Sequence, residues 1–389
     1  MWRALASNGL TVIIVLMISL AVGVTWAQKQ YTGEGPLAEA ICLQVRSGSN
    51  MGVVSDELVE RGAVSNGMIF RMGAEYTDRT QLLKAGSFLV PPGASMQEIV
   101  DSITTAGRST CGTEVNYRIG VLRAELVMRE LDPATQEYVE VAKYDPAAEE
   151  APAEYVEGTG GSDVRFRVTL AEGVTSWQVV ESLKASGFLL GEVEVPAEGS
   201  LAPDSYEVRE GSDVATLIER MQSAQQSILA EAWAERAEGL PYDSPEEALV
   251  MASIVEKETG VAEERGQVAS VFVNRLEVGM KLQTDPTVIY GVTQGRGSLG
   301  RGLRQSELRA RTDYNTYVID GLPPTPIANP GRLSIEAALN PETTPYLFFV
   351  ADGTGGHAFA ETLEEHNENV ARWREIEAER AASEPEGNN

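Results

Sequence analysis

The stretch SPEEALVMASIVEKETG, residues 244–260, predicts the helix around which the rest of the chain is organised. Ser244 is a helix-capping residue type, Pro245 suits the first helical position, and Glu247 completes a capping box. The pair at 259–260, Thr-Gly, marks the end of the helix. At roughly 100° per residue, the apolar side chains of this helix form one arc: Val250, Met251, Ile254 and Val255.

Glu258 projects inside this apolar arc, whereas Glu256 and Lys257 project towards the polar side of the helix. A carboxyl group held against apolar neighbours has a raised pKa, because burial disfavours its charged form. Such a group can stay protonated near neutral pH and act as a general acid. The alternative is a buried Glu258 that pairs with an arginine such as Arg275 and has no catalytic role.

Composition narrows the chemistry that the chain can perform. The 389 residues are enough for two or three domains, and 31 basic against 58 acidic residues give a net charge of −27. This charge argues against nucleic acid or anionic lipid as a partner. Two cysteines and two histidines are too few for a standard zinc cluster, so neither a metal nor a cofactor is expected. We expect His357 and His366 to be structural hydrogen-bonding residues and a carboxylate to carry any catalysis.

An apolar segment near the N-terminus predicts a membrane anchor. Residues 10–27, LTVIIVLMISLAVGVTWA, form an uncharged run of 18 residues, the lower end of what spans a bilayer. Arg3 is the only charged side chain before this run, which places the N-terminus in the cytoplasm. The alternative is a cleaved signal peptide, for which residues 25–27 form a poor cleavage site.

One local pattern occurs four times along the chain. An apolar strand end is followed by a glycine, then by a helix-capping residue, and then by two apolar residues on one helical face. Each copy therefore predicts a strand, a tight turn and a capped helix, and ordinary βα packing explains these residues completely. The copies begin at Val45, Val90, Leu170 and Val208, with glycines Gly48, Gly93, Gly173 and Gly211, capping residues Asn50, Ser95, Thr175 and Asp213, and apolar pairs Val54 and Leu58, Ile99 and Ile103, Val179 and Leu183, and Leu217 and Met221.

The first two copies would make one small α+β module over residues 42–109. Its architecture resembles the LysM-like module that binds glycan strands in cell-wall enzymes. Cys42 and Cys111 bracket this module and are the only cysteines, so we predict a disulfide between them. The alternative is two unpaired small apolar residues in a sheet. Residues 116–128 predict one or two strands, and 137–157 an acidic, largely disordered insertion.

The C-terminal half predicts further helices over 218–236, 263–278 and 334–339, with the second carrying an apolar stripe. Long segments rich in Pro, Gly and polar residues follow, and such loops are where a site is built. The stripe consists of Val268, Val271, Phe272 and Leu276.

The order of motifs in this half closely resembles that of the MltG (YceG-like) endolytic murein transglycosylase family. The resemblance runs from about residue 45 to residue 373, and its N-terminal anchor is also typical. Two departures are Ser200 and Ala202, where the family usually has aromatic residues. The motifs are MASIVEKET, VASVFVNRL, LQTDPTVIYG, YNTY, GLPPTPIANPG, PYLFFVADGTGGHAF and EHN.

The resemblance implies a single-pass enzyme of the cell inner membrane with its catalytic part in the periplasm. It would cut nascent peptidoglycan strands internally, between N-acetylmuramic acid and N-acetylglucosamine, and leave 1,6-anhydro-muramoyl ends. Peptidoglycan synthases become candidate partners. The family's catalytic glutamate matches Glu258, which the helical pattern indicates independently. Two other functions stay open: a hydrolytic muramidase with Asp285 as the base, and a non-catalytic glycan-binding scaffold.

Polar and aromatic side chains in the loops are candidate saccharide contacts, because they can hydrogen-bond sugar hydroxyls or stack on a ring. For residues 285–286 the alternative is simply the start of a turn. The candidates are Gln283, Thr284, Asp285, Tyr290, Tyr314, Asn315 and Tyr317.

The sequence thus predicts an α+β protein with a single transmembrane helix, a LysM-like module and a mixed α/β catalytic domain. The expected order is a cytoplasmic N-terminus (1–9), transmembrane helix (10–27), linker (28–39), LysM-like module (40–110), acidic insertion (111–163), second pair of strand–turn–helix units (164–240), catalytic domain (241–374) and acidic tail (375–389).

Overall fold

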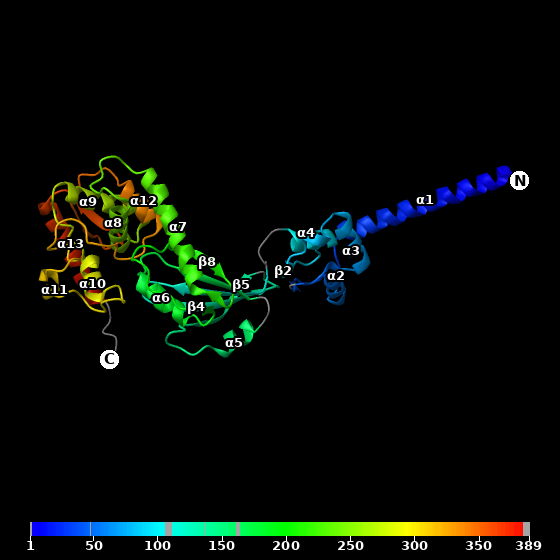
Figure 1. Cartoon of the computed structure of the whole chain (residues 1–389), viewed down its shortest axis with the longest axis horizontal. Coiled ribbons are helices and arrows are strands. Elements are labelled where there is room, and N and C mark those ends of the chain that lie inside the picture. The colour runs from blue at the N-terminus through cyan, green and yellow to red at the C-terminus, as the bar shows by residue number, and fades with distance from the viewer. Residues whose placement is uncertain (1, 47, 106–110, 136, 161–163, 384–389) are drawn as a thin grey trace. The chain divides into compact units, whose positions relative to one another are not determined.

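The computed structural model describes residues 2–46, 48–105, 111–135, 137–160 and 164–383 (Figure 1). The chain forms two compact units. The first comprises Met1–Val115, Val127–Lys143 and Ala151–Arg165, and the second comprises Asn116–Leu126, Tyr144–Glu150 and Phe166–Asn389.

The first unit contains the N-terminal helix and a small α+β module. Strands β1 and β2 pair antiparallel, with Ile41 opposite Val90 and Val45 opposite Gly86. Strand residues Leu43 and Phe88 enter a core shared with the helices of the module. The elements are α1 (Trp2–Thr32), β1 (Ile41–Val45), α2 (Met51–Glu60), α3 (Gly67–Tyr76), a 3₁₀ turn (Thr80–Leu82), β2 (Gly86–Val90) and α4 (Met96–Thr104).

All four predicted strand–turn–helix copies are confirmed. Each turn glycine has a positive φ, between 70° and 83°, which a residue with a side chain rarely adopts. Each predicted capping side chain accepts a backbone N–H at the start of its helix. The eight apolar residues on the helical faces are all buried. The pattern did not predict α3, and the LysM-like assignment of the module stays a prediction.

Helix α1 extends beyond the apolar run that the sequence shows. It holds a 22-residue segment, Thr11–Thr32, that is long and apolar enough to cross a membrane by length and composition, as a signal sequence also can be. Residues 28–32, expected to begin a linker, continue this helix. Tyr31 and Leu37 are buried in the core of the module. The reason is packing: burying the side chains of Tyr31 and Leu37 in the core is favourable, and this stabilises the helical conformation of residues 28–32.

The disulfide between Cys42 and Cys111 is confirmed, with 5.7 Å between the two Cα atoms. The backbone N–H of Cys111 donates to the carbonyl oxygen of Ser87 in β2 at 3.1 Å. Because Cys42 lies opposite Leu89 in the paired strand, this hydrogen bond brings the second cysteine beside the first. The bridge ties the chain that leaves the module to the strand that enters it.

A five-stranded sheet has the strand order β5-β4-β3-β6-β8. The two strands expected within 116–128 are confirmed as β3 and β4, but residues 137–157 do not form the expected disordered insertion. They contain β5, which is rich in the strand-favouring residues Val and Tyr, and α5. The elements are β3 (Thr113–Ile119), β4 (Ala124–Asp132), β5 (Glu137–Tyr144), α5 (Ala153–Thr159), β6 (Val164–Leu170), α6 (Ser176–Ala185), β7 (Leu189–Leu190), β8 (Ser205–Val208) and β9 (Ser212–Asp213).

Residues 214–383, which belong to the second unit, are mainly helical, and α8 lies at their centre. Helices α7, α9, α10 and α12 all contact α8, and the core that they share includes Met251, Ile254 and Phe272. The expected acidic tail begins inside α13, which continues to residue 383. The elements are α7 (Val214–Ala234), α8 (Pro245–Glu258), a 3₁₀ turn (Ala262–Glu264), α9 (Arg265–Glu277), α10 (Asp285–Thr293), α11 (Gln305–Arg309), α12 (Arg332–Leu339), β10 (Phe348–Ala351), β11 (His357–Ala360) and α13 (Leu363–Ser383).

Helix α8 begins and ends as predicted, with two differences in its side chains. Ser244 caps the helix by accepting the N–H of Glu247, but the Glu247 carboxylate accepts from Asp243 instead of closing the capping box on Ser244. Glu256 and Lys257, expected on a polar side, are half-buried against other elements. The central position of α8 explains this, because its C-terminal turn is covered by neighbours on most sides.

Candidate active site

Glu258 is the last residue of α8 and keeps part of its side chain open to solvent. Burial raises the pKa of Glu258, and the nearby charge of Asp285 raises it too. A hydrogen bond from Thr284 and the charges of His357 and Arg275 act in the opposite direction but do not cancel the rise. The negative end of the helix dipole also disfavours a carboxylate at this position. Glu258 therefore holds its proton at a higher pH than an ordinary glutamate does.

Thr284 lies at the N-cap of α10 and donates a hydrogen bond from its hydroxyl to Oε1 of Glu258. Gln283, just before it, has a φ of +50°, the left-handed region, and this turn directs the chain into α10. The sequence was expected to form a loop here. A helix forms instead because Pro286 suits the first turn, where a missing N–H costs nothing.

Two further threonines hold Thr284 in place. Thr316 accepts the N–H of Thr284 at 3.1 Å on its hydroxyl, and the hydroxyls of Thr316 and Thr287 lie 2.8 Å apart. Thr287 donates to the carbonyl oxygen of Thr284 at 2.8 Å. All three side chains are buried. This network fixes the donor that faces Glu258. Neither Thr287 nor Thr316 was among the predicted site residues.

Asp285 and Tyr317 lie close enough to Glu258 for the charges of these groups to interact. The Tyr317 hydroxyl donates to Oδ1 of Asp285 at 2.7 Å, and burial together with this carboxylate raises the pKa of Tyr317. Asp285 is exposed at the start of α10, where the helix dipole favours its negative charge. Gln283 is exposed beside it. Of these three predicted saccharide contacts, Gln283 and Asp285 are thus exposed, and Tyr317 is half-buried.

Asn315 does not fit the prediction of a saccharide contact. Its side chain is fully buried, and its amide donates to the carbonyl oxygens of Glu307, Leu308 and Ala310. Its side-chain oxygen accepts the N–H of Tyr317 at 3.1 Å. These bonds use the hydrogen-bonding capacity of the amide within the protein. Asn315 holds the loop that carries Tyr317, and this is a correction to its expected role.

The alternative prediction was that a buried Glu258 pairs with Arg275. This pair is not observed among the described residues. Arg275 is buried and donates instead to the carbonyl oxygens of Leu282 and Leu347. Burial lowers the pKa of Arg275 to about 10. Its charge acts on Glu258 without a hydrogen bond between the two in the part of the chain that the structure describes.

The two histidines have structural surroundings. His357 hydrogen-bonds through Nδ1 to Glu264 at 2.8 Å, as expected of a structural hydrogen-bonding residue. His366 stacks on Phe348 with 5.2 Å between ring centroids, while its buried Nδ1 has no hydrogen-bond partner among the described residues. Burial lowers the pKa of His366. Its contribution is therefore ring packing rather than the expected hydrogen bond.

Tyr290 and Tyr314 line a cavity of about 900 Å³, which Ser200 also lines. The two rings are tilted against each other, with centroids 5.0 Å apart. The Tyr290 hydroxyl donates to Oε2 of Glu198 at 3.1 Å, and the Tyr314 hydroxyl bonds Thr325 at 2.7 Å. Ala202 is buried instead of lining this cavity.

Glu198 is a second desolvated carboxyl group that sequence reasoning missed. Burial raises the pKa of Glu198, against hydrogen bonds from the N–H of Ser176 at 2.8 Å and from Tyr290. Its partners come from elements far along the chain, so no local pattern could reveal it.

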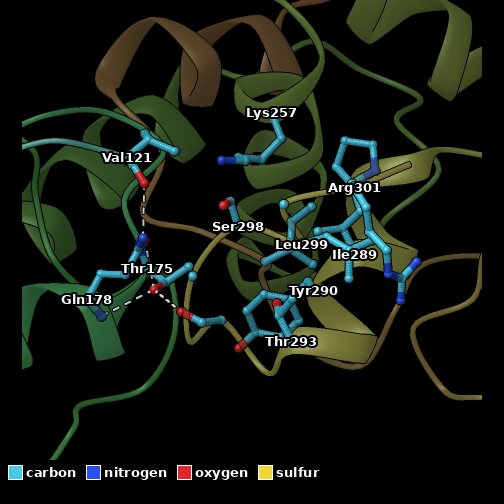
Figure 2. Close-up of a pocket in the computed structure, with 15 residues that line it drawn as sticks. Val121, Thr175, Gln178, Lys257, Ile289, Tyr290, Thr293, Ser298, Leu299 and Arg301 are labelled. Carbon is cyan, nitrogen blue, oxygen red and sulfur yellow. Dashed lines mark hydrogen bonds between the residues drawn. The ribbon is translucent and has the colours of Figure 1, made fainter. Parts of the chain in front are cut away.

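A smaller cavity of about 310 Å³ adjoins the C-terminal end of α8 (Figure 2). Lys257 and Pro286, the chain neighbours of Glu258 and Asp285, both line it, as does Arg301. Figure 2 shows the Lys257 side chain extending into this space from α8. Its ammonium donates to the carbonyl oxygen of Gly173 at 3.2 Å, and burial lowers the pKa of Lys257. Glu258 itself does not line either cavity.

The described residues hold no group of three or more histidine, cysteine, aspartate or glutamate side chains suited to a metal ion. Fold and site together describe an α+β protein with a candidate site centred on one desolvated carboxyl group. The model of the YceG-like family matches residues 120–372, so this chain belongs to the YceG-like family.

Two relatives carry the name endolytic murein transglycosylase. The protein from Bacillus subtilis (strain 168) is 37% identical over 175 residues, which cover 45% of this chain and 47% of the relative. The protein from Streptococcus pneumoniae (strain D39) is 26% identical over 361 residues, which cover 85% of this chain and 58% of the relative. The chain thus spans about half the length of these relatives. A crystal structure of a YceG-like protein from Listeria monocytogenes is 26% identical, with a TM-score of 0.45, and covers 85% of this chain and 98% of that one.

Proposed function

We propose that this protein is an endolytic murein transglycosylase with Glu258 as its catalytic acid and base. The observation that carries the proposal is the state of Glu258: a desolvated carboxyl group with a raised pKa that is still partly open to solvent. Membership of the YceG-like family and the names of the two relatives support the same reaction.

Glu258 first protonates the glycosidic oxygen between N-acetylmuramic acid and N-acetylglucosamine. Because its pKa is raised, Glu258 keeps the proton that it donates up to a higher pH than an ordinary glutamate does. The resulting carboxylate then takes the proton from the sugar's own 6-hydroxyl as that oxygen attacks the anomeric carbon. The product is a 1,6-anhydro-muramoyl end, and no second carboxylate is required. The Thr284 hydrogen bond steadies the carboxylate in this second step, because a donor stabilises the charged form.

Gln283, Asp285 and Tyr317 are the proposed saccharide contacts beside Glu258, since Gln283 and Asp285 are exposed and the half-buried Tyr317 donates to Asp285. Tyr290 and Tyr314 are proposed contacts further along the strand, at the larger cavity, where their rings can stack on sugars. Thr284 was also predicted as a saccharide contact, but its side chain is buried and donates to Glu258, so we propose it as a positioning residue instead.

The proposed location is the cell inner membrane, with α1 as a single anchor and both units in the periplasm. The apolar segment of α1 and the disulfide, which persists in oxidising compartments, support it. Peptidoglycan glycan strands are the proposed substrate, the LysM-like module a proposed glycan contact, and peptidoglycan synthases proposed partners. A reporter fused after residue 389 should be active only outside the cytoplasm, and a soluble form that starts near Gln28 would replace the anchor with a cleaved signal.

The test of the reaction is the mass of the ends released from purified glycan strands. A transglycosylase leaves anhydro ends, which are one water lighter than the ends left by hydrolysis. Internal cutting should give products of intermediate length early in the digest, before single disaccharides appear.

A hydrolytic muramidase is the second candidate, because Asp285 lies close enough to affect Glu258 and is accessible to water. It predicts reducing ends of full mass. Glycan turnover that is the same with and without Glu258 would instead favour a non-catalytic scaffold.

A further inference from the structure

Helix α3 carries an uncovered apolar stripe. Met68, Met72 and Tyr76 follow one another at four-residue spacing and are 63%, 59% and 91% exposed. The opposite face of the same helix buries Phe70 and Ala74 completely. Three large apolar or aromatic side chains in one line, on the face away from the core, are unusual on a small module and indicate a partner surface.

Helix α3 is fixed at the C-terminal end of α1. The ring of Tyr31 packs so closely on Gly73 that a Cβ there would overlap it, and the Ser65 hydroxyl donates to the side-chain oxygen of Gln30 at 3.4 Å. Gln30 and Tyr31 lie at nearly the same height on α1, whereas Ser65 and Gly73 lie near opposite ends of α3. Helix α3 therefore crosses the end of α1, at the side of the module where α1 joins it (Figure 1).

The position along α1 at which α3 crosses it matches the expected position of the bilayer surface. The uncharged run ends at Ala27, and Lys29 is the first charged residue after it. Tyr31 lies four residues beyond Ala27, which is about 6 Å along a helix. The headgroup layer on each side of the hydrocarbon is roughly 5–7 Å deep. Trp26 is exposed at the end of the run, where aromatic residues anchor helices in the interface.

We infer that α3 lies in the outer headgroup layer of the membrane that α1 spans, with Met68, Met72 and Tyr76 inserted into the lipid. The stripe points away from the module's core, and α3 is one of the two helices that contact α1, the other being α4. Beside a membrane-spanning α1, the apolar surroundings that suit such a stripe are those of the bilayer. The net charge of −27 argues against electrostatic attraction to anionic lipid, and this contact needs none because it is apolar. The inference rests on the proposed role of α1 as an anchor.

This arrangement would hold the module against the membrane instead of letting it pivot on a linker. The helical continuity of residues 28–32 and the buried side chain of Tyr31 support the same rigid attachment.

The experiment uses the full chain in nanodiscs of phosphatidylcholine. Three variants each carry one free thiol, because the native cysteines are bridged: Met72→Cys in the stripe, Leu20→Cys within the apolar run, and Val278→Cys in the second unit. The three positions are similarly exposed in the protein alone, at 59%, 69% and 66%. The rate of labelling by a negatively charged thiol reagent is measured for each.

A charged reagent is excluded from apolar surroundings, so Met72→Cys and Leu20→Cys should label at least about tenfold more slowly than Val278→Cys. An uncharged, lipid-soluble maleimide should still label Met72→Cys. Fast labelling of Met72→Cys by the charged reagent, with Leu20→Cys protected, overturns the inference and leaves the anchor standing. Fast labelling of both rejects the anchor and the inference with it. If neither reagent reaches Met72→Cys, protein rather than lipid covers the stripe, and the inference is wrong.

Discussion

The hydroxyl of Thr284 donates a hydrogen bond to Oε1 of Glu258, across 26 positions of sequence. The donor is itself fixed, because the Thr316 hydroxyl accepts the N–H of Thr284 at 3.1 Å. Burial favours the protonated form of Glu258, whereas this hydrogen bond favours the charged form. A group that gives up a proton and then takes one back needs both forms to be accessible, and the two opposing effects provide for that.

Glu258→Gln should abolish cleavage of glycan strands while the fold is retained. The amide is nearly isosteric but cannot donate the proton, and general acid–base catalysis is typically worth about 10²–10⁴-fold. The matched control is Glu256→Gln, two residues earlier on α8. Glu256 accepts from the N–H of Gly331 and the hydroxyl of Ser334, and a glutamine keeps an acceptor for them. Glu258→Gln should no longer release soluble products, whereas Glu256→Gln should largely keep this activity. The reverse result would show that Glu258 is not the catalytic residue.

Thr284→Val should move the alkaline limit of activity to higher pH. The lost hydrogen bond lowers the pKa of Glu258, so its removal raises that pKa further. A general acid works while it is protonated, and its activity falls as pH rises through its pKa. The measurement is kcat/KM against pH, and Thr284→Ser, which keeps the hydroxyl, should restore the wild-type limit. An unchanged limit in Thr284→Val would mean that the hydrogen bond does not act on Glu258.

Asp285→Asn should move the same limit in the opposite direction. The negative charge of Asp285 raises the pKa of Glu258, so removing the charge lowers that pKa and the activity falls at a lower pH. Asparagine can still accept the hydrogen bond from Tyr317, which keeps the local geometry. A transglycosylase should retain measurable activity at acidic pH. Complete loss at every pH would favour the muramidase, in which Asp285 activates water.

Much of the fold could be predicted from the sequence because its signals are local. A glycine, a capping residue and two apolar residues at helical spacing lie within about a dozen positions, and all four copies form as expected. Helix α10 and strand β5 were not predicted. In α10, residues such as Pro286 suggested a loop. In β5, the acidic composition of the segment hid the strand-favouring residues Tyr138, Val139 and Val141.

The site was predictable only in part, for the same reason. Glu258 could be singled out because its helix places it in an apolar arc, and Thr284 and Asp285 because they follow a recognisable motif. Thr316 and Glu198 could not, since their partners lie 32 and 92 positions away in sequence. Asn315 shows the converse error. A polar residue in a loop motif suggested a sugar contact, but its amide is used to hold the loop.

Removing the disulfide should destabilise the module without affecting the site. In Cys42→Ser/Cys111→Ser the constraint on a 69-residue separation disappears from the unfolded state, and the chain-entropy model assigns it about 4 kcal/mol of stability. Amide hydrogen exchange, measured on peptides from β1 and β2, reports the stability of this module separately from that of the second unit. These amides should exchange faster in the variant than in the wild type.

The control is wild-type protein treated with reductant, because the variant also places a serine at the buried position 111. The reduced wild-type protein should show the same faster exchange as the variant. The rate of glycan-strand cleavage should stay within about twofold of the wild-type rate. The site belongs to the other unit, and mutations at distant positions without shared contacts rarely affect each other. Unchanged exchange in both the variant and the reduced protein would mean that packing of the strands and helices, not the bridge, holds the module together.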